Sequence, residues 1–329
     1  MNRPIALVTG ANGFIGSHLC ERLLQQGYHV RALVRTTSNL QFIENLDVEL
    51  VYGELIKPES LSPILENVDY VYHPGGLVRA RNEKAFMQVN RIGTRNLLQA
   101  VENIRPNLKR FVHISSQAAA GPSDSVKPIT EDYPPAPVSA YGRSKLASEV
   151  EVMSFKDKFP ITIIRPSVVY GPRDSDVYKF FRLARRGINL RLGMARMYVS
   201  LINVTDLVAC ILAAAQSEKA VGEVFFVANP ESYEYTSIMH MIADIMDRNI
   251  IDLVVPVWVA KCFAGIIEYV SQVLRKSAPL NKDKLAELSR NFWLCSPEKA
   301  KNILGWNPVI PVEEGFRQTW QWYLEKKWL

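Results

Sequence analysis

Three side chains suited to proton transfer stand in the first half of the chain. Tyr141 and Lys145 are four residues apart at the start of a predicted helix, and Ser116 ends a predicted strand before them. Side chains at i and i+4 share one face of a helix, so we expect the Lys145 ammonium near the phenol. A cation there would lower the pKa of Tyr141 from its usual value of about 10. With Ser116 bonded to the same oxygen, the three candidate catalytic residues predict proton exchange with an alcohol or a carbonyl.

The Tyr-x-x-x-Lys spacing alone proves little, because it arises by chance in a chain with 13 tyrosines. A second match, Tyr323 and Lys327, lies at the C-terminus, and we interpret it as accidental. Taken singly, Ser116, Tyr141 and Lys145 could each have a purely structural role. Their order along the chain, behind a glycine-rich turn, favours the catalytic interpretation.

The glycine-rich turn runs from Thr9 to Gly16, between a predicted strand and a predicted helix. Its spacing is GxxGxxG, with Ala11 in place of the middle glycine of the commonest dinucleotide fold. Glycines bring the backbone close to a pyrophosphate, and the helix N-terminus offers free N–H groups. The alternative is a turn that merely needs a positive φ. We expect six residues to bind a dinucleotide: Gly10, Asn12, Gly13, Phe14, Ile15 and Gly16.

The end of the second predicted strand bears on the choice between NAD and NADP. A carboxylate there would bond the ribose 2′-hydroxyl of NAD, whereas a cation would pair with the 2′-phosphate of NADP. The segment 30–38 contains no acid, and Arg35 is followed by three hydroxyl residues. We therefore predict that Arg35 binds the cofactor and that NADP is preferred over NAD. Arg31, inside the strand, is a weaker candidate, and a solvated Arg35 is the structural alternative.

Composition excludes several other classes of protein. The 329 residues, 48% hydrophobic and 22% charged, are enough for two domains with large cores. The net charge of +6 is spread without a nucleic-acid motif, so we expect no nucleic-acid partner. The four cysteines and five histidines show no metal-ligand spacing, so we expect no metal site and a reducing, cytoplasmic location. No apolar run is long enough to predict an integral membrane span or a signal peptide.

Alternating elements predict the fold. Six β-branched runs read as strands and are separated by segments of helical periodicity: 5–8, 29–34, 48–52, 70–73, 110–114 and 161–165. Repeated βα units imply an α/β fold with a Rossmann-type, doubly wound parallel sheet. We expect this dinucleotide-binding domain to comprise residues 1–165 and 198–228, with strands at 198–204 and 224–227 returning to the sheet. Residues 166–197 and 229–329 would form a smaller, mostly helical substrate domain.

Taken together, these motifs resemble the extended branch of the short-chain dehydrogenase/reductase superfamily, which includes the NAD-dependent epimerase/dehydratase family. The resemblance covers nearly the whole chain: 9–16, 90–96, 115–116, 141–145, 165–172, 204–207 and 301–308. It implies that Ser116, Tyr141 and Lys145 are catalytic, that Lys145 also holds the nicotinamide ribose, and that Asn90 is a structural support. It also implies cofactor contacts at three further positions: Glu54, Leu55 and Pro166.

Departures from the family pattern narrow the chemistry. The family's dehydratases carry an acidic pair after the catalytic hydroxyl residue, whereas Gln117 and Ala118 stand there in this chain. Nucleotide-sugar epimerases usually carry an arginine where Val199 or Ser200 stands. Glu54 replaces a usual aspartate, and residues 73–76 read His-Pro-Gly-Gly rather than His-x-Ala-Ala. Residues 30–35 look like those of NADP-using dihydroflavonol reductases, and the C-terminal half is similar to that of 3β-hydroxysteroid dehydrogenase relatives.

We therefore expect an NAD(P)-dependent dehydrogenase/reductase that acts on a hydroxyl or ketone of a small, lipophilic substrate. A sugar or nucleotide-sugar epimerase with tightly bound NAD is the alternative, and a non-catalytic dinucleotide sensor is a third. Residues 253–274 predict an amphipathic helix that closes an apolar pocket, touches a membrane peripherally or contacts another subunit. The resemblance implies a homodimer formed by the helices near 84–101 and 140–158.

Overall fold

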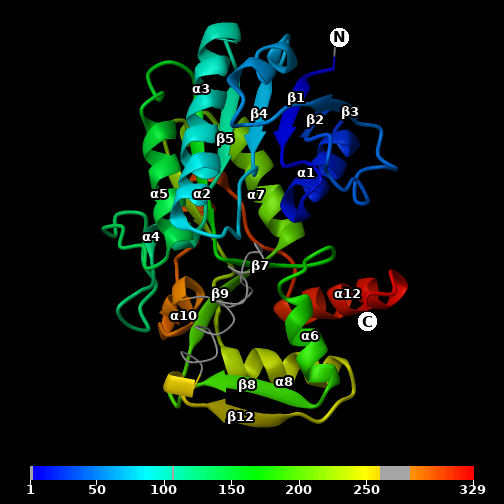
Figure 1. The fold of residues 1–329 in the computed structure, drawn as a ribbon, viewed down its shortest axis with the longest axis vertical. Coiled ribbons are helices and arrows are strands. Elements are labelled where there is room, and N and C mark those ends of the chain that lie inside the picture. Colours follow the sequence, from blue (N-terminus) through cyan, green and yellow to red (C-terminus); the bar gives the residue numbers. More distant parts are fainter. Residues whose placement is uncertain (1–2, 106, 260–281) are drawn as a thin grey trace.

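The computed structural model describes residues 3–105, 107–259 and 282–329. Its main feature is a seven-stranded sheet in which every pair of neighbouring strands is parallel (Figure 1). In spatial order the strands are β3 (Glu49–Tyr52), β2 (His29–Val34), β1 (Ile5–Thr9), β4 (Tyr70–His73), β5 (Arg110–Ile114), β6 (Ile161–Pro166) and β10 (Val224–Val227). The strand order reverses between β1 and β4, and ligands of such sheets bind at the carboxyl ends of strands at this point.

Helices cover both faces of the sheet, so the doubly wound Rossmann-type fold is confirmed. On one face, α1 (Phe14–Gln25) and α7 (Val204–Gln216) pack against Ala6 and Val8 of β1. On the other face, α3 (Gly93–Ile104) and the end of α5 (Ala140–Met153) share a core with Leu7. Successive residues of β1 thus point into two different cores, as the period of a strand requires. The six strands predicted in the first half of the chain are all present.

One expected strand lies elsewhere. Val224–Val227 joins the sheet beside β6 as predicted, but β9 (Tyr198–Asn203) does not. It lies in a separate four-stranded sheet with β7 (Val168–Tyr170), β11 (Ser232–Glu234) and β13 (Phe292–Trp293). The physical reason is the crossover: β9 leads into α7, and α7 returns the chain so that β10 takes the place beside β6. The division of the chain into the two expected domains stays a prediction.

Three of the remaining helices, α6 (Tyr178–Arg185), α8 (Tyr235–Ile245) and α12 (Val312–Glu325), lie beyond the carboxyl edge of the main sheet (Figure 1). Tyr170, Phe181, Phe316 and Tyr323 form the centre of an aromatic core there. A two-stranded parallel sheet of β8 (Ile188–Leu192) and β12 (Ile251–Val255) lies at the far end. The other elements are α2 (Glu83–Phe86), π-helical η3 (Met87–Ile92), α4 (Gln117–Ala120), α10 (Lys282–Leu288), α11 (Glu298–Leu304) and the 3₁₀ turns η1 (Pro58–Ser60), η2 (Pro63–Leu65) and η4 (Glu218–Ala220).

The predicted start of the helix over 253–274 is wrong, because residues 253–255 are the last residues of strand β12. Residues 260–274 lie outside the described residues, so the three roles weighed for this segment stay open. Within the described ranges, no helix is long and apolar enough to cross a membrane.

A buried ion pair joins α5 to β6. Arg165 donates to Glu149 through Nε at 2.9 Å and through Nη2 at 2.7 Å, and both side chains are almost fully buried. The guanidinium also lies 5.5 Å from the centre of the Phe226 ring. Removing one partner of a buried pair leaves an uncompensated charge in the interior. This pair therefore fixes the middle of α5 against the sheet.

We expect Glu149→Gln to lower the free energy of unfolding by about 3 kcal/mol or more, because Arg165 would lose its counter-charge. Urea unfolding followed by circular dichroism measures this change. As a matched control, Glu313→Gln removes an exposed ion pair with Arg317 and should change stability by about 0.5 kcal/mol. Similar losses in the two variants would contradict the structural role of the buried pair.

Candidate active site

The glycine-rich turn lies at the carboxyl end of β1, at the reversal of strand order. Gly10 has a φ of +58°, and the N–H of Gly13 donates to the Gly10 carbonyl at 3.0 Å. Gly13 then caps α1 without any side-chain hydrogen bond, and the first turn of α1 carries no acid. The first N–H groups of α1 and its positive dipole end therefore suit a phosphate.

Close packing explains why glycines stand in this turn. A Cβ added to Gly16 would lie 2.1 Å from the Gly10 carbonyl oxygen. A Cβ on Gly10 would lie 2.9 Å from the Cα of Gly75, and one on Gly75 would lie 2.5 Å from Oγ1 of Thr9. The unusual glycines after His73 thus match the close approach of this loop to the turn. The cradle has the backbone shape that a dinucleotide pyrophosphate requires.

A buried chain of hydrogen bonds supports the turn from beneath. The N–H of Gly75 donates to Oγ1 of Thr9 at 3.0 Å, and this hydroxyl lies 2.7 Å from Nδ1 of His73. On the other side of the ring, Nε2 lies 2.9 Å from Oγ1 of Thr94, which donates to the Asn90 carbonyl at 2.6 Å. The chain links the ends of β1 and β4 to the π-helical turn.

The partners of His73 determine its tautomer. Because the Thr94 hydroxyl proton is used on a carbonyl, Thr94 accepts from Nε2–H, and Nδ1 is left to accept from Thr9. Burial, with a smaller contribution from the charge of Lys145, lowers the pKa of His73 to about 3. The imidazole is therefore neutral in the working range of pH. It acts as a fixed connector and carries no proton to the site.

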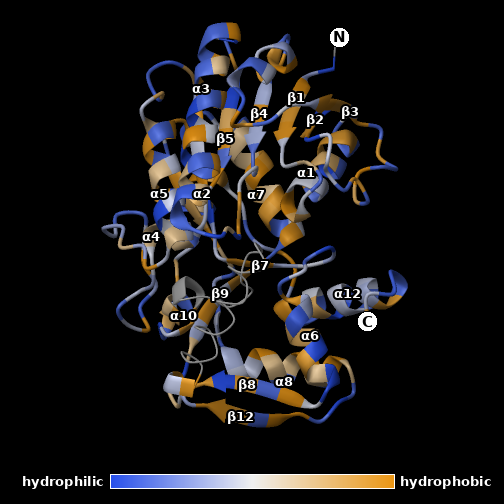
Figure 2. Cartoon of the chain, in the orientation of Figure 1, coloured by the Kyte–Doolittle hydropathy of each residue, from blue (hydrophilic) through white to orange (hydrophobic). Residues whose placement is uncertain are grey.

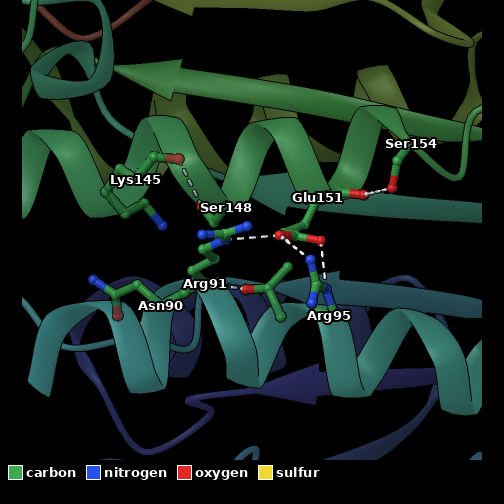
Figure 3. Close-up of polar contacts among 8 residues, drawn as sticks. Asn90, Arg91, Arg95, Lys145, Ser148, Glu151 and Ser154 are labelled. Carbon is green, nitrogen blue, oxygen red and sulfur yellow. Dashed lines mark hydrogen bonds and ion pairs between the residues drawn. The ribbon is translucent and has the colours of Figure 1, made fainter. Parts of the chain in front are cut away.

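Asn90 holds α5 against η3 and the loop after β4. Its Oδ1 accepts from the Leu77 N–H at 2.7 Å, and its Nδ2 donates to the Leu77 carbonyl at 3.0 Å and to Oγ of Ser144 at 2.9 Å. Further along the same pair of helices, Glu151 accepts from Arg91 and Arg95, each at 2.7 Å (Figure 3). The supporting position expected for Asn90 agrees with these contacts.

The structure brings the three candidate catalytic residues together. Tyr141 and Lys145 lie in the first two turns of α5, and the Ser116 hydroxyl hydrogen-bonds the Tyr141 phenol. Nζ of Lys145 is buried and donates to the Ile114 carbonyl at 2.7 Å. Ser116 also caps α4, accepting from the Ala118 N–H at 3.1 Å. A phenol, a hydroxyl and an ammonium therefore gather at the carboxyl end of β5.

The expected lowering of the Tyr141 pKa is wrong for this arrangement. Burial raises its pKa to about 12, against the lowering effect of the Ser116 hydrogen bond, and the charge of Glu287 raises it further. Burial also lowers the pKa of Lys145 to about 8, with Glu149 opposing. The physical reason is that the ammonium bonds a backbone carbonyl and burial disfavours the phenolate. Tyr141 is consequently a protonated phenol at neutral pH.

Arg35 lies on an exposed loop just after β2. Its N–H donates to Oγ of Ser38 at 3.0 Å, and Nδ2 of Asn12 reaches the Asn39 carbonyl of this loop at 3.1 Å. Arg31 is used structurally, because Glu49 and two backbone carbonyls bind its guanidinium. Of the two arginines, Arg35 is the exposed one, and its contact with a cofactor stays a prediction.

Three further expected cofactor residues lie after β3 and at the end of β6. Glu54 pairs with Lys57 at 2.7 Å, and the Leu55 carbonyl accepts from Nδ2 of Asn96 at 2.8 Å. Pro166 is the last residue of β6. These positions share the carboxyl edge of the sheet with the turn. Their contacts with a cofactor stay predictions.

Glu287 was not foreseen from the sequence. Ser139 caps α5 by accepting from the Gly142 N–H at 3.0 Å, and it donates to Oε1 of Glu287 at 2.6 Å. This contact ties α10 to the start of α5, close enough for the carboxylate to act on Tyr141. No motif surrounds Glu287, and nearly 150 residues separate it from Ser139, so the sequence offers no signal for it.

Several buried polar atoms at the carboxyl edge of the sheet were not predicted as candidate binding groups from the sequence. Four side chains that follow β5, β6 and β10 carry an atom without a hydrogen-bond partner in the described part of the chain: Ser115 Oγ, Gln117 Nε2, Ser167 Oγ and Asn229 Oδ1. Unpaired buried polar atoms are costly, so they are expected to bind something. Their place at predicted strand ends is the signal that could have identified them.

Comparison with known proteins gives consistent matches. The model of the NAD dependent epimerase/dehydratase family matches residues 6–228. Ceramide reductase of Caulobacter vibrioides is 28% identical over 327 residues, covering 99% of this chain and 96% of the relative. UDP-glucose 4-epimerase of Vibrio cholerae is 29% identical and covers 97% and 95%. The decarboxylating sterol-4-alpha-carboxylate 3-dehydrogenase of Mus musculus is 27% identical and covers 95% and 89%.

A solved structure extends the match to three dimensions. UDP-glucuronic acid 4-epimerase from Bacillus cereus, solved in complex with UDP-glucuronic acid and NAD, superposes with a TM-score of 0.78. The match covers 98% of this chain and 99% of the other at 25% identity.

We expect Gly16→Ala to weaken dinucleotide binding at least about tenfold, because the new Cβ would push α1 away from the Gly10 carbonyl. Calorimetric titration with NADPH and with NADH measures the affinities. As a control, Gly27→Ala meets no atom within 4 Å but has a φ of +81°, so it should only reduce stability. Unchanged affinity in Gly16→Ala would show that the turn does not hold the cofactor.

Proposed function

The chain belongs to the NAD dependent epimerase/dehydratase family, and from this premise we propose that it is an NAD(P)-dependent dehydrogenase/reductase acting on a hydroxyl or ketone of a small, lipophilic substrate. The observation that carries the proposal is that Ser116, Tyr141 and buried Lys145 come together at the carboxyl end of β5, where Lys145 donates to the Ile114 carbonyl. Dehydrogenases, a reductase and epimerases are among the relatives of this extended short-chain dehydrogenase/reductase.

The glycine-rich turn and the start of α1 would hold the pyrophosphate, and Lys145 would hold the nicotinamide ribose. When bound, the nicotinamide supplies or accepts the hydride. In the reducing direction, Tyr141 donates its phenolic proton to the substrate oxygen while the Ser116 hydroxyl donates a hydrogen bond to the same oxygen. The positive charge of Lys145 then stabilises the phenolate that is left.

The protonation of Tyr141 bears on the direction of the reaction. Burial raises the pKa of Tyr141 to about 12, so the phenol holds its proton at neutral pH and needs a nearby positive charge to give it up. Glu287 acts in the same direction. Proton donation accompanies reduction of a carbonyl, so the protonated phenol is the form of Tyr141 that reduction requires.

One feature of the chain and the names of two relatives favour a lipophilic substrate over a nucleotide sugar. Val199 is buried, and Oγ of Ser200 accepts from the Cys295 N–H at 3.2 Å, so neither position offers the arginine usual in nucleotide-sugar epimerases. Two of the relatives are named for lipid substrates, a ceramide and a sterol carboxylate. Gln117 and Ala118 after Ser116 give no acidic pair for elimination.

An epimerase with tightly held NAD is the second candidate, favoured by the 29% identity to UDP-glucose 4-epimerase. It would consume no cofactor, and NAD would remain bound during purification.

We propose a cytoplasmic location as well, because the described cysteines Cys20, Cys210 and Cys295 are free and buried. A homodimer through α3 and α5 remains a proposal drawn from similar proteins.

We expect Tyr141→Phe to lower turnover by about two to four orders of magnitude without weakening NADPH binding, because it removes only the acid. Loss of NADPH absorbance with a panel of long-chain and polycyclic ketones measures turnover. Tyr52→Phe, at a tyrosine 54% exposed, serves as the control and should leave turnover unchanged. A non-catalytic sensor would instead keep its biological activity in Tyr141→Phe, and full turnover in that variant would remove the catalytic proposal.

For the cofactor, NADPH should bind more tightly than NADH, since Arg35 is exposed beside the turn and no acid accompanies it. Arg35→Ala should weaken NADPH binding about tenfold, the value of one charge-assisted hydrogen bond, and leave NADH unaffected. Calorimetric titration of both cofactors measures this. Arg22→Ala, at an exposed arginine in the last turn of α1, is the control. Equal affinities for NADPH and NADH in the unmodified protein would refute the preference.

A further inference from the structure

The two-stranded sheet at the far end of the molecule exposes an aliphatic face. Strands β8 and β12 run parallel with Ile188 opposite Ile251 and Leu190 opposite Leu253. Alternate residues of a strand share a face, so these four side chains lie together on one side of the sheet. Ile251 is 69% exposed, Leu253 45% and Leu190 40%. Figure 2 shows hydrophobic residues alternating with hydrophilic ones along these strands, at the end remote from the main sheet.

The polar residues of the same two strands point the other way. Asn189 is fully buried and donates through Nδ2 to Oδ1 of Asp252 at 2.9 Å, and Asp252 lies 3.5 Å from Nε2 of His240 on α8. A strand pair at a protein surface ordinarily turns its apolar side inward and its polar side to water. Here the pattern is reversed at the centre of the sheet, which leaves aliphatic side chains in water unless something covers them.

At the carboxyl end of the same face, Leu192 and Val255 pack against Leu285 of α10, and the segments that follow the two strands carry exposed apolar side chains. The Gly193 N–H donates to the Val255 carbonyl at 2.9 Å, which brings the segments after the two strands together. Met194 and Trp258 on these segments are 78% and 70% exposed. Contiguous exposed apolar surface of this kind marks interaction sites. A tryptophan at the border of such a surface is typical of contact with the interface of a membrane.

Positive charge lies at one end of the aliphatic face. Residues 177–198 and 246–259 contain seven cations and two acids, and two of the cations, Lys179 and Arg196, pair with Asp176 and Glu234 outside these segments, which leaves a net charge of +3. Arg185 and Arg186 end α6 just before β8, and Arg248 precedes β12. The Ile251 N–H donates to the Gly187 carbonyl at 2.9 Å, so the beginnings of the two strands, and these arginines with them, lie together. Within the described ranges, these three arginines form no ion pair and are exposed.

We propose that this docking face, the outward side of β8 and β12 with its flanking arginines, binds peripherally to an anionic lipid bilayer. Its aliphatic side chains and Trp258 would enter the interface, and the arginines would meet lipid phosphates. A second copy of the chain is a poorer occupant, because it would bring two surfaces flanked by unpaired arginines face to face. The proposal is independent of the proposed enzymatic activity, although a membrane is where a lipophilic substrate collects.

Vesicle sedimentation of the full chain tests the proposal, with phosphatidylcholine vesicles compared with equimolar phosphatidylcholine and phosphatidylglycerol. We expect at least about tenfold tighter binding to the anionic vesicles, weakened by high salt. Arg185→Glu/Arg186→Glu should weaken this binding at least about tenfold, and Ile251→Ser/Leu253→Ser by about fivefold or more. Thermal unfolding and NADPH binding check that the variants stay folded.

Matched controls place the same changes elsewhere on the surface. Arg22→Glu/Lys219→Glu makes the same change in net charge, and Val126→Ser/Val309→Ser removes two side chains that are 67% and 78% exposed. Both controls should bind vesicles as the unmodified protein does. The proposal is overturned if the protein does not bind anionic vesicles, or if the control variants lose as much vesicle binding as the docking-face variants. A concentration-dependent dimer that Ile251→Ser/Leu253→Ser abolishes, without vesicle binding, would assign the face to self-association instead.

Discussion

The hydrogen bond from Lys145 to the Ile114 carbonyl is the contact on which the arrangement of the site depends. It places a buried ammonium at the carboxyl end of β5 and fixes the first two turns of α5 against the sheet. One turn later Glu149 meets Arg165 of β6, and on the opposite side Ser144 meets Asn90. Much of the buried side of α5 is therefore polar, where most helices bury apolar residues. Each of these groups needs its partner, so α5 has few alternative positions.

The same constraint separates the roles of two buried basic residues, His73 and Lys145. His73 is neutral and bonded at both nitrogens, which makes it part of the scaffold. Lys145 keeps a pKa near 8, low for a lysine but compatible with a positive charge at neutral pH. A positive charge is thus kept at the carboxyl end of β5, while the hydrogen-bond chain beneath the glycine-rich turn is uncharged. The charge of Lys145 itself helps to keep His73 neutral, because it lowers the pKa of the imidazole.

Local patterns allowed the main sheet, the glycine-rich turn and the closeness of Ser116 to Tyr141 to be predicted. Each of the six early strands is a short β-branched run, and the turn residues on either side of such a run indicate where the strand begins and ends. The place of β9 could not be predicted in this way, because a run such as 198–203 suits either sheet and only the crossover through α7 decides. The pKa of Tyr141 and the approach of Glu287 depend on burial and on α10, a distant element. Such effects arise from the assembled fold and leave no trace in the spacing of residues.

The π-helical turn at Met87–Ile92 has a consequence of a different kind. In a regular helix each residue advances the direction of a side chain by about 100°, so a wider turn shifts the phase of everything that follows. Asn90 lies inside this turn and meets both Leu77 and Ser144. The direction of the Asn90 side chain therefore depends on the number of residues in the π-helical turn as well as on the residue type at position 90. Insertions or deletions in this segment would therefore redirect Asn90 more than substitutions at its neighbours would.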